Sequence, residues 1–278
     1  MIDNISVFGS TGFVGSEYCS MYRNRCIEID RSDNVPKSKD ILYFISTIDN
    51  YNVYDDPYLD IQTNLVKLVS VLEETKKLED VTFNFVSSWF VYGKTNNLPV
   101  RESDPCNPSG FYSITKYAAE KLLASYCETF GINYRILRLT NIIGSSDKKV
   151  SKKKNALQYM INQLKNDEPV NLYDNGDPIR DYMHINDCVR AISLVVNSKD
   201  KNTIVNISNN EPKRIGDLVY YAKDKLKSKS EIISIPAPDF HKTVQNKDMC
   251  LDNTRLRMLG YTPSLNVYDG INMILENR

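Results

Sequence analysis

Residues 5–15 read ISVFGSTGFVG, and this stretch decides the fold. The apolar run from Ile2 to Phe8 predicts a short strand. The residues from Phe13 to Tyr22 have helical length and contain no proline, and no glycine after Gly15. A strand, a tight turn and a helix are therefore expected here, which is the opening unit of an α/β fold.

The turn within this stretch has the spacing Gly9-x-x-Gly12-x-x-Gly15. Glycine suits a place where the turn is tight, where the backbone approaches a pyrophosphate and where helix meets strand, while the helix N-terminus faces the phosphates. The spacing therefore predicts a dinucleotide-binding loop. Its cofactor-binding residues are expected to be Gly9, Thr11, Gly12, Phe13, Val14 and Gly15.

The end of the second predicted strand, Cys26 to Asp30, carries the next cofactor candidates. Asp30 lies 21 residues after Gly9, where a carboxylate can accept hydrogen bonds from the adenine-ribose diol. Arg31 can pair with a 2′-phosphate, which Asp30 would repel. The sequence leaves NAD and NADP open, and we favour NADP as a hypothesis.

The alternation of strands and helices continues along the first half of the chain. The expected elements are strands over 40–46, 81–87 and 132–139, and helices over 57–77, 110–130 and about 155–165. They indicate an α/β protein with a Rossmann-type doubly wound parallel sheet and a smaller C-terminal substrate-binding lobe. We expect the Rossmann core to span 1–140 plus about 182–206, and the smaller lobe to span about 141–181 and 207–278.

Polar residues recur where the predicted strands end. In parallel sheets, ligands bind beyond the carboxyl ends of the strands, so residues at these ends meet along one edge. At or just past such ends lie Gly9, Asp30, Ser46 with Thr47, Ser88 and Asn141. We expect Ser46 and Thr47 to bind the cofactor.

A hydroxyl, a phenol and an ammonium follow in an order suited to hydride chemistry. Tyr112 lies 24 residues after Ser88, and Lys116 lies one helical turn after Tyr112. Moving a hydride to or from an alcohol carbon requires a proton to join or leave the oxygen, and a phenol of pKa about 10 is a poor base at neutral pH. A neighbouring ammonium lowers that pKa, so Tyr112 with Lys116 would be the acid/base and Ser88 would hold the substrate oxygen.

Composition argues against several other classes of protein. The 278 residues are 41% apolar, and the 35 basic and 35 acidic residues leave no net charge, so neither nucleic acid nor a membrane surface is indicated. Six cysteines form no C-x-x-C pair and only two histidines occur, so no metal site is expected. Without a basic leader, an apolar signal core or a run near 18 apolar residues, we expect a soluble, cytoplasmic protein.

Five ordered motifs resemble those of the extended short-chain dehydrogenase/reductase family, in its NAD-dependent epimerase/dehydratase group that acts on nucleotide-diphosphate sugars. They are the glycine turn at 9–15, SSWFVYG at 87–93, YSITK at 112–116, RLTN at 138–141 and RDYMHIND at 180–187. The resemblance covers nearly the whole chain. It implies an enzyme with a nucleotide-diphosphate sugar as its substrate.

The resemblance also implies roles for single residues. Ser88 is the catalytic hydroxyl, Tyr112 the acid/base, and Lys116 its partner and a ligand of the nicotinamide ribose. Tyr112 and Lys116 thus also contact the cofactor. Substrate contacts are expected from Ser88, Trp89, Asn141 and Arg180, with the Arg180 guanidinium on the diphosphate. The alternative for Arg180 is an ion pair with Asp181.

Two departures from the family pattern narrow the chemistry. The 4,6-dehydratases of the family carry an Asp-Glu pair directly after the catalytic hydroxyl, whereas Trp89 and Phe90 stand here and cannot exchange protons. Dehydration is therefore disfavoured. Only nine residues separate Asp30 from Asp40, where the family commonly has a helix and a further strand, so this unit is expected to be absent.

Three functions remain open. We favour a reductase of a 4-keto-(6-deoxy)sugar nucleotide, with a nucleotide-sugar 4-epimerase that retains NAD as the alternative and a non-catalytic dinucleotide sensor as the third. The resemblance implies a homodimer through the helices at 57–77 and 110–130. Five lysines just past Gly144 could steer an anionic substrate or be a solvated charge run: Lys148, Lys149, Lys152, Lys153 and Lys154.

Overall fold

The computed structural model describes residues 4–95, 97–147, 150–151, 153–244 and 247–276. At its centre lies a six-stranded sheet in the order β2-β1-β3-β4-β5-β9, in which every neighbouring pair is parallel. Its strands are β1 (Ile5–Phe8), β2 (Cys26–Ile29), β3 (Asp40–Tyr43), β4 (Thr82–Ser88), β5 (Asn133–Leu139) and β9 (Thr203–Ile207). The predicted Rossmann-type α/β fold is confirmed.

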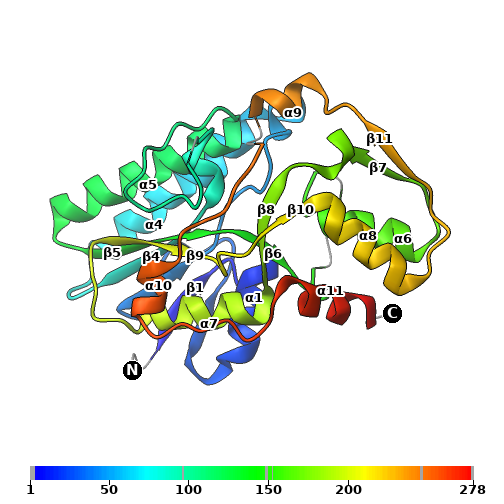
Figure 1. Cartoon of the computed structure of the whole chain (residues 1–278). Coiled ribbons are helices and arrows are strands. Elements are labelled where there is room, and N and C mark those ends of the chain that lie inside the picture. Colours follow the sequence, from blue (N-terminus) through cyan, green and yellow to red (C-terminus); the bar gives the residue numbers. More distant parts are fainter. Residues whose placement is uncertain (1–3, 96, 148–149, 152, 245–246, 277–278) are drawn as a thin grey trace.

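Helices cover both faces of this sheet (Figure 1). One face packs on α4 (Lys67–Thr75) and α5 (Phe111–Phe130), and the other on α1 (Phe13–Met21), α7 (Ile185–Val196) and α10 (Thr254–Met258). Strands buried on both sides favour apolar residues, and apart from Ser6 and Asp40 all residues of β1 and β3 are apolar. Leu256 and Tyr261 also pack in the second of these cores, so the chain returns to the sheet late in its course.

The predicted helix at 57–77 forms as three continuous segments. Asp56 accepts a hydrogen bond from the Tyr58 N–H at 3.0 Å and caps α3 (Pro57–Ile61), which begins with a proline at its first turn. A π-helical turn (Gln62–Val66) then leads into α4. A short helix, α2 (Asn52–Asp55), precedes them.

The segment between β2 and β3, beside the predicted adenine-ribose site, is as short as the sequence indicates. β2 is the edge strand, and residues 31–39 return to β3 without forming a helix or a strand. The unit that the family commonly has at this place is therefore absent.

A smaller lobe lies beside the sheet, on the right in Figure 1. It contains one sheet of β6 (Asn141–Ile143), β8 (Ile179–His184) and β10 (Pro212–Arg214), and a second of β7 (Val170–Tyr173) and β11 (Ile232–Ile235). Its helices are α6 (Ala156–Lys165), α8 (Ile215–Leu226), α9 (Asp239–Val244) and α11 (Val267–Glu276). Short 3-10 turns occur at Arg23–Arg25, Trp89–Tyr92 and Asp174–Gly176. Within the described ranges, no helix is long and apolar enough to cross a membrane.

Candidate active site

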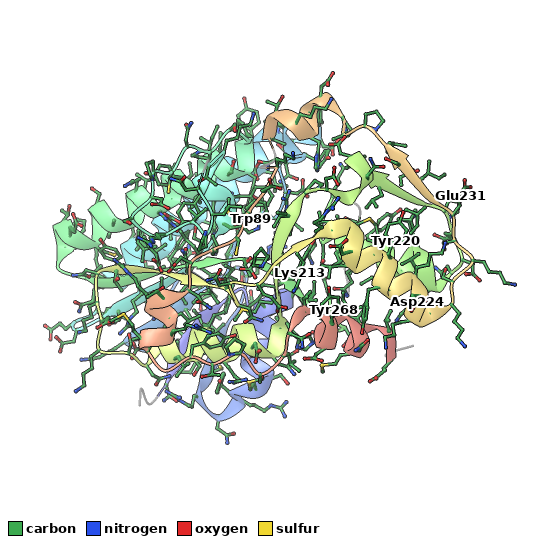
Figure 2. The ribbon with its side chains drawn as sticks, in the orientation of Figure 1. Trp89, Lys213, Tyr220, Asp224, Glu231 and Tyr268 are labelled. Atoms are coloured by element: carbon green, nitrogen blue, oxygen red, sulfur yellow. The ribbon has the colours of Figure 1, made fainter. Side chains whose placement is uncertain are left out.

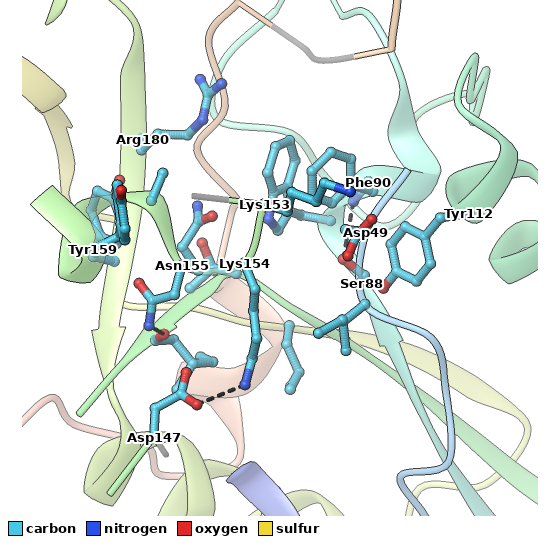
Figure 3. A pocket seen from close by; sticks show the side chains of 18 of the residues that line it. Asp49, Ser88, Phe90, Tyr112, Asp147, Lys153, Lys154, Asn155, Tyr159 and Arg180 are labelled. Atoms are coloured by element: carbon cyan, nitrogen blue, oxygen red, sulfur yellow. Dashed lines mark hydrogen bonds and ion pairs between the residues drawn. The ribbon is translucent and has the colours of Figure 1, made fainter. Parts of the chain in front are cut away.

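A cavity of about 420 Å³ opens between the carboxyl ends of the central strands and the smaller lobe. Figure 3 shows side chains from both sides pointing into it. Ten of the residues predicted from the sequence line this space: Phe13, Val14, Ser46, Thr47, Ser88, Trp89, Tyr112, Lys116, Asn141 and Arg180. The cavity therefore gathers predicted residues that are up to 167 positions apart in the sequence.

Ser88 and Tyr112 approach each other from the end of β4 and the first turn of α5. The Ser88 Oγ accepts a weak hydrogen bond of 3.4 Å from the Phe90 N–H, which starts the 3-10 turn after the strand. Gly110 immediately precedes α5, and a Cβ on it would lie 2.1 Å from the Asn50 Oδ1. The absence of that Cβ lets Asn50 accept the Ser113 N–H at 3.3 Å and so position the helix start that carries Tyr112.

Burial dominates the protonation of Tyr112 and Lys116. It raises the pKa of Tyr112 to about 12, against the opposite effect of hydrogen bonds with Ser88 and Ser46. It lowers the pKa of Lys116 to about 7, while the negative charge of Glu120 acts in the other direction. The sequence predicts a lowered Tyr112 pKa; that prediction is wrong for this structure, because burial raises the pKa, the negative charges of Asp60 and Asp49 add to the rise, and the hydrogen bonds with Ser88 and Ser46 do not offset it.

Lys116 belongs to a buried polar network that the sequence analysis missed. Glu120 lies one turn after Lys116 on α5 and forms an ion pair with Arg138, with Nη2 to Oε2 at 2.7 Å and Nε to Oε1 at 3.1 Å. The Ser87 hydroxyl donates to the Glu120 Oε1 at 2.5 Å. The network ties α5 to β4 and β5 directly below Ser88. The spacing of four residues from Lys116 to Glu120 was the available signal.

Ser46 and Thr47 are held by Asn64 from the π-helical turn. The Asn64 Oδ1 accepts from the Ser46 hydroxyl at 3.1 Å and from the Thr47 N–H at 2.9 Å. Its Nδ2 donates to the hydroxyls of Thr47 and Thr115 at 2.8 and 3.0 Å. Asn64 therefore links the end of β3 to α5, a role that no local sequence pattern indicates.

The glycine turn has the close packing that its spacing predicts. Gly9 has φ +82°, and a Cβ on Gly15 would lie 2.3 Å from the Gly9 carbonyl oxygen. Gly12 precedes the first turn of α1, and no side chain caps that turn, so its N–H groups suit a pyrophosphate. Gly9, Thr11 and Gly12 lie on the turn and Gly15 lies in the first turn of α1, and none of the four is among the residues that line the cavity.

Asp30 and Arg31 lie in an exposed loop beyond β2, also outside the cavity lining. The Asp30 Oδ1 accepts from the Ser32 N–H at 2.9 Å and from its hydroxyl at 2.6 Å, and these bonds lower the pKa of the Asp30 carboxyl. The Lys67 ammonium donates to the Arg31 carbonyl at 2.9 Å and to the Asp33 carbonyl at 3.0 Å. Lys67 of α4 thus holds this loop in place.

Asn141 and Arg180 line the lobe side of the cavity. The Asn141 Nδ2 donates to the Asp181 carbonyl at 3.0 Å. The Arg180 Nη1 donates to the carbonyls of Ile179 and Lys247 at 2.8 and 2.5 Å, and its Cζ lies 5.4 Å from the Trp89 ring centre. Because side chains alternate along β8, Arg180 lines the cavity while the buried Asp181 does not, and burial raises the pKa of Asp181 to about 6.

Two of the five lysines past Gly144 are described, and both are engaged. The Lys153 ammonium pairs with Asp55 at 3.4 Å, and the Lys154 ammonium pairs with the buried Asp147 at 2.7 Å (Figure 3). Lys148, Lys149 and Lys152 lie outside the described residues. Lys153 and Lys154 also line the cavity.

The fold and this site define a Rossmann-type protein with a cavity for a ligand beyond the carboxyl ends of its strands. The NAD dependent epimerase/dehydratase family matches residues 41–208, which is more than half of the chain. The protein belongs to this family, as the sequence motifs indicate.

Individual relatives fall into more than one activity class. A GDP-6-deoxy-D-mannose reductase of Pseudomonas aeruginosa is 24% identical over 81% of this chain and 75% of its own. The structure of a UDP-glucose 4-epimerase from Thermotoga maritima with UDP-glucose superposes with a TM-score of 0.87 at 21% identity, covering 98% of this chain and 97% of that chain. A UDP-glucuronic acid 4-epimerase from Bacillus cereus with UDP-glucuronic acid and NAD gives 0.86 at 19%, covering 99% and 100%. These structures share the fold.

Proposed function

We propose that this protein is an NAD(P)-dependent reductase of a ketone at C4 of a nucleotide-diphosphate sugar. One observation carries the proposal: Ser88, Tyr112 and Lys116 line the same cavity as Phe13 and Val14, which begin the helix after the glycine turn. A hydroxyl, a phenol and an amine beside a dinucleotide turn supply the proton that a hydride transfer requires.

Each of the three residues has a distinct part in this mechanism. A bound NAD(P)H supplies the hydride. The Tyr112 O–H donates its proton to the C4 oxygen, and the Ser88 hydroxyl donates a hydrogen bond that holds this oxygen against the phenol. A protonated Lys116 stabilises the phenolate that is left, because a nearby positive charge favours the ionised form.

The lobe side of the cavity suits the rest of such a substrate. The Arg180 guanidinium can donate two hydrogen bonds to the oxygens of a diphosphate, and burial of Arg180 strengthens charge-assisted hydrogen bonds. Asn141, at the start of β6, would contact the sugar nucleotide. Lys153 and Lys154 add positive charge at this wall.

The exposed Arg31 and the short return from β2 to β3 favour the reductase, whereas Ser88, Tyr112 and Lys116 serve both reactions equally. A 4-epimerase with retained NAD is the alternative; it must begin by removing a proton, and the two epimerases of the same fold support it. For the cofactor, family membership supports NAD, and the exposed Arg31 supports our hypothesis of NADP.

Purification followed by denaturation separates these functions. Tightly held NAD and no net oxidation would favour the epimerase. An empty site and stoichiometric loss of NADPH absorbance at about 340 nm with one 4-keto sugar nucleotide would establish the reductase. If Tyr112→Phe left every turnover unchanged, the mechanism would be wrong and a non-catalytic sensor would take its place.

A homodimer in the cytoplasm completes the proposal. The predicted interface helices expose large apolar side chains on their outer sides, among them Tyr58, Val66, Leu122 and Phe130. Exposed apolar patches of this kind favour association. A monomeric mass in solution at micromolar concentration would contradict the dimer.

A further inference from the structure

The two residues after Ser88 form an aromatic surface in the cavity. Trp89 and Phe90 stack with ring centres 3.9 Å apart at an interplanar angle of 24°. The Phe90 ring meets the Tyr112 ring edge-on at 5.9 Å, and the Arg180 Cζ lies 5.4 Å from the Trp89 ring centre. We call the continuous series Arg180, Trp89, Phe90 and Tyr112 the aromatic row. It leads from Arg180, the proposed ligand of the diphosphate, to Tyr112, the proposed acid/base.

Phe90 is the member of the row that a ligand can touch best. Both rings line the cavity, but Trp89 is 3% exposed and belongs to a core cluster with Val91 and Tyr92, whereas Phe90 is only half-buried and packs against that cluster. Figure 2 shows Trp89 toward the middle of the molecule, and Figure 3 shows Phe90 close to Ser88 and Tyr112. Trp89 therefore supports Phe90 from behind.

A benzene ring selects against hydroxyl groups. A ligand hydroxyl placed on Phe90 would leave water and find no hydrogen-bond partner in the ring, which is unfavourable. A methyl group or a C–H face in the same place gains from burial and from contact with the ring. The part of the substrate that lies on Phe90 is therefore apolar.

We propose that Phe90, supported by Trp89, determines specificity for a 6-deoxy sugar. This inference rests on the proposed function, because it requires the C4 oxygen to lie at Tyr112. Phe90 touches Tyr112, so a substituent on a carbon bonded to C4 lies on the Phe90 ring. Of the two carbons bonded to C4 in a hexopyranose, C5 carries the exocyclic C6, which is a methyl group in a 6-deoxy sugar and a hydroxymethyl group in a hexose.

The fluorescence of Trp89 provides a test that needs no turnover. Trp89 is the single tryptophan among the 278 residues, so tryptophan emission reports on the aromatic row alone. With saturating NADP+ present, the full chain is titrated with UDP-, dTDP- and GDP-linked hexoses and with the matching 6-deoxyhexoses. For the nucleotide whose sugars bind, we expect the 6-deoxyhexose to change the emission at a roughly tenfold lower concentration than the matching hexose. Trp89→Phe should abolish the signal.

Variants separate a role in specificity from a role in packing. Phe90→Asn offers hydrogen-bond partners to a hydroxyl and should bring the ratio of the affinities for 6-deoxyhexose and hexose to about one. Phe90→Leu keeps the surface apolar and should retain the wild-type ratio. The matched control is Phe130→Asn, because the Phe130 ring packs on Tyr126 at 4.6 Å and neither residue lines the cavity. It should leave the ratio unchanged. A purely structural Phe90 would alter stability and leave the ratio as it is in wild type.

The outcomes distinguish this inference from the proposed function. Equal affinities for hexose and 6-deoxyhexose in the wild type, or no response of Trp89 to any sugar nucleotide, would overturn the inference. Oxidation of NADPH by a 4-keto sugar would still support the reductase in either case. A preference that depends on Phe90 with no oxidation of NADPH would support the inference as a binding property and would overturn the reductase.

Discussion

Replacing Lys116 by methionine should stabilise the protein at neutral pH, although it removes a residue of the proposed mechanism. Lys116 is 2% exposed, and its Nζ lies 4.3 Å from the centre of the Phe85 ring. Burial lowers its pKa from the ordinary 10.5 to about 7. Each pKa unit corresponds to about 1.4 kcal/mol, so placing the ammonium here costs about 4 kcal/mol at pH 7. Methionine has a similar length and carries no charge.

The sign of the pH dependence follows from the two pKa values. Below about pH 7 Lys116 is protonated in the folded and unfolded chains, and the whole cost applies. Between about pH 7 and 10.5 the unfolded chain binds the proton and the folded chain does not, so the stability of the wild type rises with pH. The advantage of the methionine variant should therefore fall by about 2 kcal/mol from pH 7 to pH 9.

Urea unfolding at pH 7, 8 and 9 measures this difference. The matched control is Lys121→Met, which makes the same substitution on the exposed side of α5 and should change the free energy of unfolding by less than about 0.5 kcal/mol. No gain for Lys116→Met at pH 7 would refute the argument from burial. A gain of equal size at pH 7 and pH 9 would show that improved packing, and not loss of a buried charge, stabilises the variant.

Three further substitutions test the network, the turn and the cofactor edge. Glu120→Gln should lower the free energy of unfolding by about 3 kcal/mol, measured by urea unfolding, because the buried Arg138 loses its charged partner; an unchanged midpoint would contradict this. Gly15→Ala should weaken NADPH binding at least roughly tenfold in a fluorescence titration, because its Cβ would lie 2.3 Å from the Gly9 oxygen and displace the turn; wild-type affinity would argue against the turn as the cofactor site. Arg31→Ala should raise the KM for NADPH and leave that for NADH unchanged; comparable values for both cofactors in variant and wild type would remove the basis for NADP.

Much of the fold could be predicted because its signals are local. Glycine spacing at 9–15, between an apolar run and a segment of helical length, predicts a tight turn, and the structure leaves no room for a Cβ on Gly15. The apolar run of β3 and the nine-residue gap after Asp30 likewise predict a buried strand and a shortened edge, and the structure has both. Such features depend on neighbours within a few residues, so the sequence contains them directly.

The properties of the site could not be predicted in the same way, because the pKa values of its residues depend on which side chains exclude water from them. Ser88, Tyr112 and Lys116 can be named from spacing, yet spacing alone predicts a lowered Tyr112 pKa, and burial by distant segments raises it. The ion pair between Glu120 and Arg138 joins a helix to a strand, so only the packed chain reveals it.

The aromatic row shows the same division. That Trp89 and Phe90 follow Ser88 is a property of the sequence. Phe90 contacts Tyr112, and Arg180 lies against Trp89 although it is 91 positions further along the chain. The packing of the lobe against the sheet decides these contacts. By itself, the sequence determined the elements and the identity of the reactive groups, because short-range patterns encode them. Tertiary structure decided their protonation and their partners, because both depend on solvent exclusion and on contacts between residues far apart in the chain.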